Sequence, residues 1–333
     1  MTTDTRFAPE VLVRQMARSV SECQLDLSGA TVLTEAATGA YAVTPVLAAL
    51  GGAKRVYAFT RKTRYGTVRE VAAQTSELAA AAKVTDRICI VDQVSPEMIY
   101  SADIVTNSGH LRPIDAEFID GLNSRAVISL MFEAWELPTR PDDVDVQAAN
   151  RRKLRIAGTN ERHPNVDVFS YLAHMAARGL FEAGVAVYRS RVGLLCDNSF
   201  ADFIRAGLER FGAEVHVATS PMGLSDVDLD AIVVALLPRD ADVIGHREAK
   251  ALAGRSPGVH LVQMWGDVDR RSLKREGLSV FPATEPAKGH MGILPSEIGA
   301  EPIVRLQTGG LKVAQVLMLD DPSPTESAYV DYL

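Results

Sequence analysis

The stretch Arg191-Val-Gly-Leu-Leu195, followed by the turn Cys196-Asp-Asn198, decides the fold. Its apolar run is short and uninterrupted, which is typical of a strand buried on both faces of a parallel sheet. Residues 200–211 then repeat apolar side chains at helical spacing, and residues 214–219 form another short apolar run. This is a strand–helix–strand unit. Because open α/β sheets bind ligands at the carboxyl ends of their strands, its polar turn is a candidate binding position.

The same alternation extends in both directions from this unit. Before it, strands are expected at residues 30–34, 55–60, 87–91, 103–106, 126–130 and 154–157, with helices between most of them. After it, strands are expected at residues 230–237, 259–264 and 278–281. This rhythm predicts an α/β fold of two tandem Rossmann-like domains, each a doubly wound parallel sheet, with a ligand cleft between them.

The domain boundary is expected where the chain becomes polar and rich in proline. The segment Pro138–Asp145 meets that description, so we expect the first domain at residues 1–140 and the second at 141–297. The alternative is that this segment is a long loop within the first domain. An amphipathic helix over residues 298–318 could pack back on the first domain, and the acidic tail 319–333 is expected to be loosely packed.

Composition narrows the class of protein. The chain has 333 residues, of which 47% are hydrophobic and 23% are charged, so it can bury large cores. A formal net charge of -7 argues against nucleic acid or an anionic membrane surface as a partner, but not against a small anionic substrate. The 3 cysteines are widely spaced, which indicates neither a disulfide framework nor a zinc site, and no metal is expected. Without a signal pattern or a long apolar run, a cytoplasmic protein is expected.

Three segments resemble the D-isomer-specific 2-hydroxyacid dehydrogenases, such as formate and glycerate dehydrogenases. They are the run 143–160, the segment 190–215 and Gly289-His-Met-Gly292. The resemblance implies an NAD(P) cofactor, with His290 as the acid/base histidine and Arg239 as the arginine that binds the substrate. The chain lacks the family's glycine-rich turn, since Cys196–Ala201 contains no glycine. In this turn Asp197 and Asn198 are the candidate cofactor-binding residues, although Asp197 places a carboxylate where a diphosphate would sit.

The first domain contains a second candidate nucleotide site. The turn after its first strand contains Glu35, Thr38 and Gly39, and apart from Glu35 its side chains are small enough for a ligand to approach the backbone. Its second strand leads into a basic cluster that begins at Arg61, which could meet the 2′-phosphate of NADP. The alternative is that these are solvated charges. The same region also resembles the methyltransferase fold, although Arg61 stands where that family has an acidic residue.

Polar and aromatic side chains gather after several expected strands. Strand ends of a doubly wound sheet share one edge, so these groups could line a site for a small, anionic substrate. Glu133 is a catalytic candidate, and the candidate substrate-binding residues are His110, Arg112, Asn160, Arg162, His163 and Trp265. The alternative is that loops are polar in any case.

These observations lead to three hypotheses. The first is an NAD(P)-dependent oxidoreductase acting on a small carboxylate-bearing metabolite, in which Arg239 or Arg112 binds the carboxylate and His290 exchanges the proton. The second is a transferase that binds S-adenosylmethionine at residues 35–39. The third is a non-catalytic protein that binds a metabolite or partner. A homodimer is an expectation by analogy with the fold.

Overall fold

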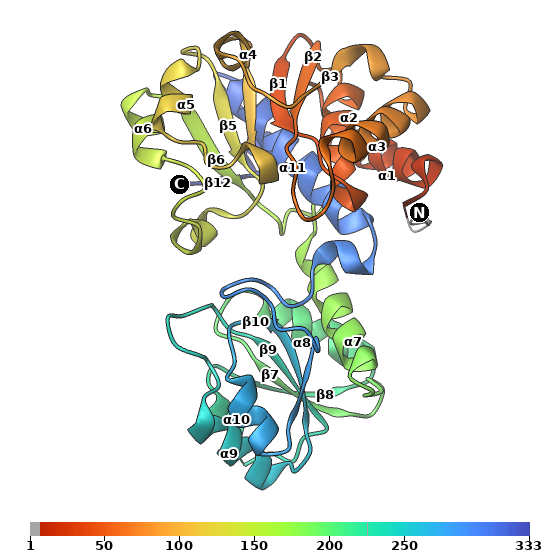
Figure 1. The fold of residues 1–333 in the computed structure, drawn as a ribbon, viewed down its shortest axis with the longest axis vertical. Helices are drawn as coiled ribbons and strands as arrows, with labels where there is room; N and C mark the ends of the chain where they lie inside the picture. The colour runs from red at the N-terminus through yellow and green to blue at the C-terminus, as the bar shows by residue number, and fades with distance from the viewer. Residues whose placement is uncertain (1–6, 225) are drawn as a thin grey trace. The chain divides into compact units, whose positions relative to one another are not determined.

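The computed structural model describes residues 7–224 and 226–333, and the chain divides into two compact units. Unit 1 runs to Val168 and resumes over Gly299–Leu333, whereas unit 2 is Phe169–Ile298. Each unit is a mainly parallel sheet covered by helices, so the predicted α/β class with two Rossmann-like sheets is confirmed (Figure 1).

Unit 1 contains a sheet of 7 strands in the order β12-β6-β5-β4-β1-β2-β3. The strands are β1 Thr31–Glu35, β2 Arg55–Phe59, β3 Ile88–Val91, β4 Ile104–Asn107, β5 Val127–Leu130, β6 Arg155–Thr159 and β12 Val330–Tyr332. The helices are α1 Pro9–Glu22, α2 Val43–Leu50, α3 Val68–Ala81, α4 Pro96–Ser101, α5 Ala116–Gly121, α6 Val146–Arg151, α11 Glu301–Met318 and α12 Pro324–Ser327.

The order of the six parallel strands in unit 1 is that of the dinucleotide-binding fold. Read from β3, the order is 3-2-1-4-5-6, and β12 adds an antiparallel strand beside β6. The order reverses between β1 and β4, where Leu33 pairs with Val105. A crevice forms at such a switch point because the connections on its two sides leave in opposite directions.

Helices cover both faces of this sheet. Val32 and Ile104 point into one apolar core with α1, α2 and α11, whereas Leu33 and Val105 point into the other with α5 and α6. Helix α11 lies close to the sheet because it contains Gly309, where an added Cβ would meet Cγ2 of Thr159 in β6 at 3.1 Å. The helix that follows unit 2 in sequence is therefore part of the core of unit 1.

Unit 2 contains 5 parallel strands in the order β11-β10-β9-β7-β8. The strands are β7 Arg191–Leu195, β8 Glu214–Ala218, β9 Ala231–Ala235, β10 His260–Trp265 and β11 Ser279–Phe281, and the helices are α7 Leu172–Glu182, α8 Ala201–Arg210, α9 His246–Arg255 and α10 Arg270–Arg275. Its switch point lies between β7 and β9. Leu261 packs into a core with α9 and α10, whereas Val262 faces α7, where Gly179 gives it room.

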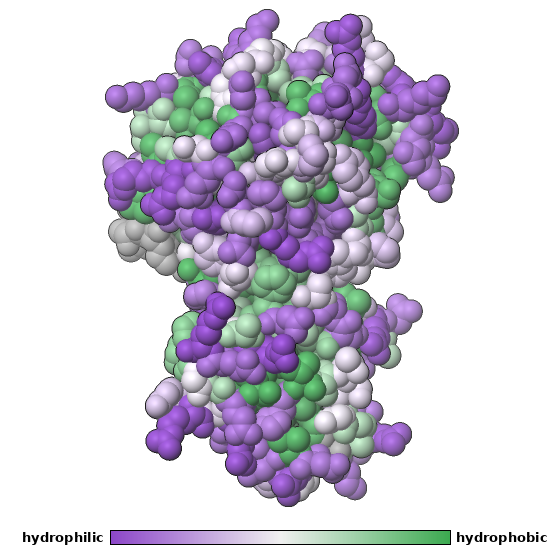
Figure 2. Space-filling model, turned by 180° about the vertical axis from the view of Figure 1, so that it is seen from behind, coloured by the Kyte–Doolittle hydropathy of each residue, from purple (hydrophilic) through white to green (hydrophobic). Residues whose placement is uncertain are grey.

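On the face drawn in Figure 2, hydrophilic residues predominate and hydrophobic residues occupy smaller areas between them. Among the described helices, none combines the length and the apolarity that a membrane span requires.

The structure corrects two expectations about domain organisation and agrees with a third. Unit 1 continues to Val168 instead of ending near residue 140, because β6 pairs with β5 and belongs to the first sheet. The helix at 301–318 packs on unit 1, as we considered. The tail is not loosely packed, because it forms β12, in which Val330 pairs with Thr159.

The tail offers a direct test of this packing. Tyr329 is 5% exposed and stacks on His163 with ring centroids 3.7 Å apart, whereas Tyr332 is 58% exposed. We predict that Tyr329→Ala lowers the free energy of unfolding of unit 1 by about 3–5 kcal/mol, as for other buried aromatic residues. Tyr332→Ala should change it by no more than about 0.5 kcal/mol.

Urea unfolding checks this prediction in a Trp265→Phe background, where the fluorescence comes from Trp135 in unit 1. Equal effects of the two tyrosine substitutions would contradict the described packing of the tail.

Candidate functional site

The switch point of unit 1 is organised around Glu35, the last residue of β1. Its side chain is 5% exposed and accepts a hydrogen bond of 2.9 Å from the backbone N–H of His110, in the loop after β4. The loop passes so close that a Cβ at position 109 would meet Glu35 Oε2 at 2.2 Å, which explains Gly109. Burial raises the pKa of Glu35, while the His110 N–H and the nearby charges of His110 and Arg112 lower it.

The ring of His110 lies across the ends of β1 and β2. Its Nδ1 is 3.0 Å from the carbonyl oxygen of Ala36 and 3.4 Å from Oγ1 of Thr60. Because a carbonyl oxygen only accepts hydrogen bonds, Nδ1 carries the proton and the neutral ring has its lone pair on Nε2. Within the described residues Nε2 has no hydrogen-bond partner, so it is available to a ligand.

Asn107 ends β4 beside Glu35. Leu33 pairs with Val105 and Thr34 Oγ1 lies 2.7 Å from Thr106 Oγ1, and Glu35 and Asn107 are the next residues of these two strands. Asn107 is 2% exposed, yet neither its Oδ1 nor its Nδ2 has a hydrogen-bond partner in the described structure. A buried amide without partners is costly, so this position is incomplete without another polar group.

The basic loop after β2 lies beside the turn after β1. Thr38 Oγ1 donates to the carbonyl oxygen of Tyr65 at 3.4 Å, and a bridge between Thr63 and Gly66 folds the loop back on itself. Arg61 and Lys62 are exposed, and neither has an ion pair or hydrogen bond within residues 7–224 and 226–333. The structure therefore brings together the small-residue turn and the two free cations.

Arg64 and Tyr65 occupy the tip of this basic loop. The guanidinium of Arg64 lies 4.7 Å from the centroid of the Tyr65 ring and donates to the tyrosine oxygen. Gly39 has a φ of +65°, and its N–H donates to Gln74 Oε1 at 3.1 Å. This leaves the turn with one fewer free N–H for a ligand.

A second polar group lies at the ends of β5 and β6. Glu133 is buried, and it accepts hydrogen bonds from Trp135 Nε1 at 2.6 Å and from Arg162 Nε at 3.0 Å. Burial raises the pKa of Glu133, whereas the contacts with Trp135 and Arg162 lower it. Glu133 and Arg162 were predicted separately, and the structure pairs them.

Glu161 lies in the same group of side chains. Burial raises the pKa of Glu161 well above its ordinary range. The carboxylates of Glu136 and Glu133 raise it further, whereas the charges of Arg140 and Arg162 lower it. A protonated carboxyl group is therefore favoured here. No group of three or more His, Cys, Asp or Glu residues in the described chain is arranged to hold a metal ion.

The remaining candidates in unit 1 have structural partners. Asn160 Nδ2 donates to the carbonyl oxygen of Ala328 at 2.9 Å, and Arg112 forms an ion pair of 2.7 Å with Asp143. His163 stacks on a tyrosine of the tail, and burial lowers the pKa of its ring, which disfavours the cation. The anion-binding role considered for His163 is therefore not supported by its surroundings.

The switch point of unit 2 is filled by its own side chains. Asp197 Oδ1 accepts from the N–H of Leu237 at 2.9 Å, and its Oδ2 forms an ion pair of 2.8 Å with Arg239. Asn198 donates to the carbonyl oxygen of Ala235 at 2.8 Å and accepts from the N–H of Phe200 at 3.0 Å. Asp197 and Asn198 thus connect the ends of β7 and β9, at the position expected for a diphosphate.

Trp265 and His290 also belong to unit 2. Trp265 stacks on Phe200 with ring centroids 5.7 Å apart, and its Nε1 donates to the carbonyl oxygen of Gly289 at 3.1 Å. This contact, together with the two hydrogen bonds from the Gly289 N–H to Asp267, positions the loop that contains His290. His290 itself is exposed.

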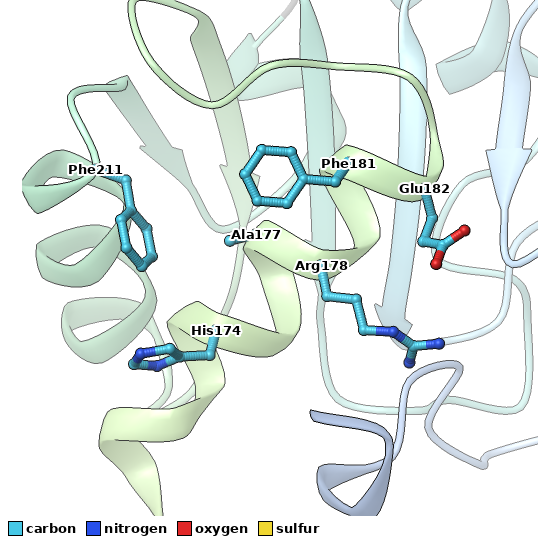
Figure 3. A pocket seen from close by; sticks show the side chains of 6 residues that line it. All are labelled: His174, Ala177, Arg178, Phe181, Glu182 and Phe211. Atoms are coloured by element: carbon cyan, nitrogen blue, oxygen red, sulfur yellow. The ribbon is translucent and has the colours of Figure 1, made fainter. Parts of the chain in front are cut away.

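A separate hollow of about 470 Å³ lies on the outer side of α7 (Figure 3). It is lined by His174, Ala177, Arg178, Phe181, Glu182 and Phe211. None of the candidate residues lines this hollow. It is also distinct from the carboxyl edge of the sheet, where the candidates lie.

No protein-family model matches the chain, and no curated protein matches it either. Solved structures do. One dipicolinate synthase subunit, from Bacillus halodurans, has a TM-score of 0.53 and 12% identity, over 89% of this chain and 100% of that chain. The corresponding dipicolinate synthase chain from Bacillus subtilis has a TM-score of 0.52 and 11% identity, over 88% and 97% of the two chains.

A third similar structure is the NAD-dependent formate dehydrogenase from Staphylococcus aureus, solved in complex with NAD. Its TM-score is 0.49 and its identity 12%, over 86% of this chain and 93% of that chain. The comparison with the two dipicolinate synthase chains shows a shared fold. The α/β architecture of two Rossmann-like sheets, which the alternation of strands and helices predicts, is therefore also that of these solved structures.

Three residues at the switch point of unit 1 were not among the site residues predicted from the sequence. They are Asn107, Thr60 and Gly109, and each gains its significance from the order of the strands. Asn107 and His110 lie about 75 residues from Glu35 in sequence, yet β1 and β4 are neighbours in the sheet. The polar composition of residues 107–112 was visible in the sequence, but the contact of this loop with Glu35 was not.

The raised pKa of Glu161 gives a test of this region. A folded-state pKa above the ordinary value means that the folded chain binds more protons than the unfolded chain, so stability falls as pH rises from about 4.5 upward. We predict that Glu161→Gln raises the melting temperature of unit 1 by roughly 2–4 °C at pH 8, equivalent to about 1 kcal/mol.

The gain in melting temperature should shrink as the pH falls toward 4.5. Glu161 of the folded parent chain is then protonated and uncharged, like the glutamine of the variant. The exposed Glu77 in α3 provides a control, since Glu77→Gln should show no such trend. Calorimetric melting at several pH values measures the effect. A Glu161→Gln chain that is less stable than the parent at pH 8 would show that the charged carboxylate stabilises the fold.

Proposed function

We propose that this chain is an NAD(P)-dependent oxidoreductase that acts on a small carboxylate-bearing metabolite and holds its dinucleotide on unit 1. The observation that carries the proposal is the strand order 3-2-1-4-5-6 of unit 1, with a basic loop beside the turn at the end of β1. In this order a dinucleotide lies across the switch point, with its diphosphate at the turn after β1 and its adenosine toward β2.

The residues of unit 1 fit this ligand. Ala36, Ala37, Thr38 and Gly39 form a turn of small side chains, which allows a phosphate to approach the backbone. The carboxylate of Glu35 does not oppose this, because it leaves β1 on the face of Leu33, away from α2. Its hydrogen bond to the His110 N–H holds it there.

The cations of the basic loop favour a phosphorylated ribose. Arg61 and Lys62 follow β2, where a ribose 2′-hydroxyl is bound by a carboxylate and a 2′-phosphate by arginine. No carboxylate stands at either position. The same feature disfavours S-adenosylmethionine, which has no phosphate for these cations.

The candidate residues for the metabolite, Arg239 and His290, both belong to unit 2. When bound, the nicotinamide provides the hydride acceptor or donor. Arg239 can bind the carboxylate of the metabolite when this carboxylate replaces Asp197 as its ion-pair partner. The exposed His290 can hold or release a proton. The fold is shared with the dipicolinate synthase of Bacillus halodurans, whose name refers to a dicarboxylate, and this supports a carboxylate-bearing substrate class.

Cofactor binding tests the proposal. We predict that NADPH binds to the chain and that Arg61→Ala weakens this binding by at least about tenfold, the loss of one charge-assisted hydrogen bond. NADH affinity should be nearly unchanged, because NADH has no 2′-phosphate. Isothermal titration calorimetry with NADPH, NADH and S-adenosylmethionine measures all three affinities.

Arg69→Ala serves as the matched control, since Arg69 is also exposed but lies on α3. The proposal fails if none of the three ligands binds at millimolar concentration. Binding of S-adenosylmethionine alone would instead favour the transferase hypothesis.

A further inference from the structure

We propose that His110 binds a phosphate group of the dinucleotide through its protonated Nε2, and so makes the affinity for the cofactor depend on pH. This inference rests on the proposed function and deepens it. It assigns a cation that compensates for the missing glycine-rich turn.

The position of the ring is the first support. Nδ1 is held 3.0 Å from the carbonyl oxygen of Ala36, the residue that opens the turn after β1. The backbone of His110 is held by Glu35 as well, so both ends of the residue are fixed. Because Nδ1 already donates to protein, only Nε2 remains for a ligand at the carboxyl ends of β1 and β2.

The turn itself is the second support. Dinucleotide-binding turns usually bind the diphosphate with free backbone N–H groups and a helix N-terminus. Here the Gly39 N–H is already bonded to Gln74, and a single turn of 3-10 helix, Gly39–Ala42, separates the turn from α2. A positively charged imidazole beside this turn would replace part of the missing interaction.

Titratable and charged side chains face the ring from three elements. Glu35 faces His110 from β1 and accepts its backbone N–H. Arg61 and Lys62 follow β2 and are exposed to solvent, while Arg112, on the same loop as His110, is neutralised by Asp143. The turn from Ala36 to Gly39 contributes no charged side chain.

The side chain of Asn107 is an independent observation that points to a ligand in this crevice. Its side-chain amide is buried at the end of the same strand that leads to His110, and both of its polar atoms lack partners in the described structure. A ligand with hydrogen-bond donors and acceptors at the switch point would satisfy it.

The experiment compares the affinity for NADP⁺ of the full chain with that of His110→Gln from pH 6 to pH 8.5, by calorimetry. NADP⁺ is the probe, and the ratio of the two dissociation constants at each pH removes the contribution of the titrating 2′-phosphate. We expect His110→Gln to bind about tenfold more weakly than the parent at pH 6, the effect of one charge-assisted hydrogen bond, and equally well at pH 8.5.

Two further variants make the result specific. His246→Gln alters an exposed histidine at the start of α9 in unit 2, and its ratio should remain near one throughout. Glu35→Gln should keep the dependence on pH, and disappearance of the dependence in a folded Glu35→Gln chain would assign it to the carboxyl group and overturn the inference. Circular dichroism establishes that each variant is folded.

Different results would contradict the proposed function and the role of His110. If NADP⁺ gives no binding to the parent chain at any pH, the proposed function fails, and this inference fails with it. If NADP⁺ binds but the ratio for His110→Gln is the same at pH 6 and pH 8.5, the proposed function stands and the role of His110 is rejected.

Discussion

The hydrogen bond from the His110 N–H to the buried carboxylate of Glu35 is the constraint on which the candidate site depends. A carboxylate removed from water must be bonded, so the loop after β4 has to pass directly over the end of β1. That close passage requires a glycine at position 109. It also places the imidazole against the Ala36 carbonyl and leaves Nε2 available. One buried carboxyl group therefore shapes the crevice at which the strand order reverses.

The two units differ in how side chains connect the strand ends at their switch points. In unit 2, Asp197 accepts bonds from Leu237 and Arg239, so the ends of β7 and β9 are joined to each other. In unit 1, the ends of β1 and β4 are joined below the surface by Glu35, whereas the side chains of Asn107, Arg61 and Lys62 have no hydrogen-bond or ion-pair partner in the described structure. The unsatisfied groups are thus at the switch point of unit 1, which is why we place the dinucleotide there.

Much of the fold could be predicted from the periodicity of the sequence. The strand expected at 30–34 is β1, Thr31–Glu35, and the helix expected at 298–318 is α11, Glu301–Met318. Periodicity identifies a strand but not its neighbours, so the strand at 154–157 was assigned to the wrong sheet and the boundary was placed too early. The prediction of a loosely packed tail was wrong for a similar reason. The tail is structured because it pairs with β6, which its own composition does not reveal. In the site, Glu35 and His110 were both recognised, but their contact follows only from strand order.

The measurement that tests the central claim most directly is hydrogen–deuterium exchange of the full chain with and without saturating NADP⁺. The account predicts slower exchange in residues 36–40, 60–66 and 107–112 of unit 1, and little change in the turn at 196–200. Protection confined to residues 196–200 and 236–240 would place the dinucleotide on unit 2 and contradict the account.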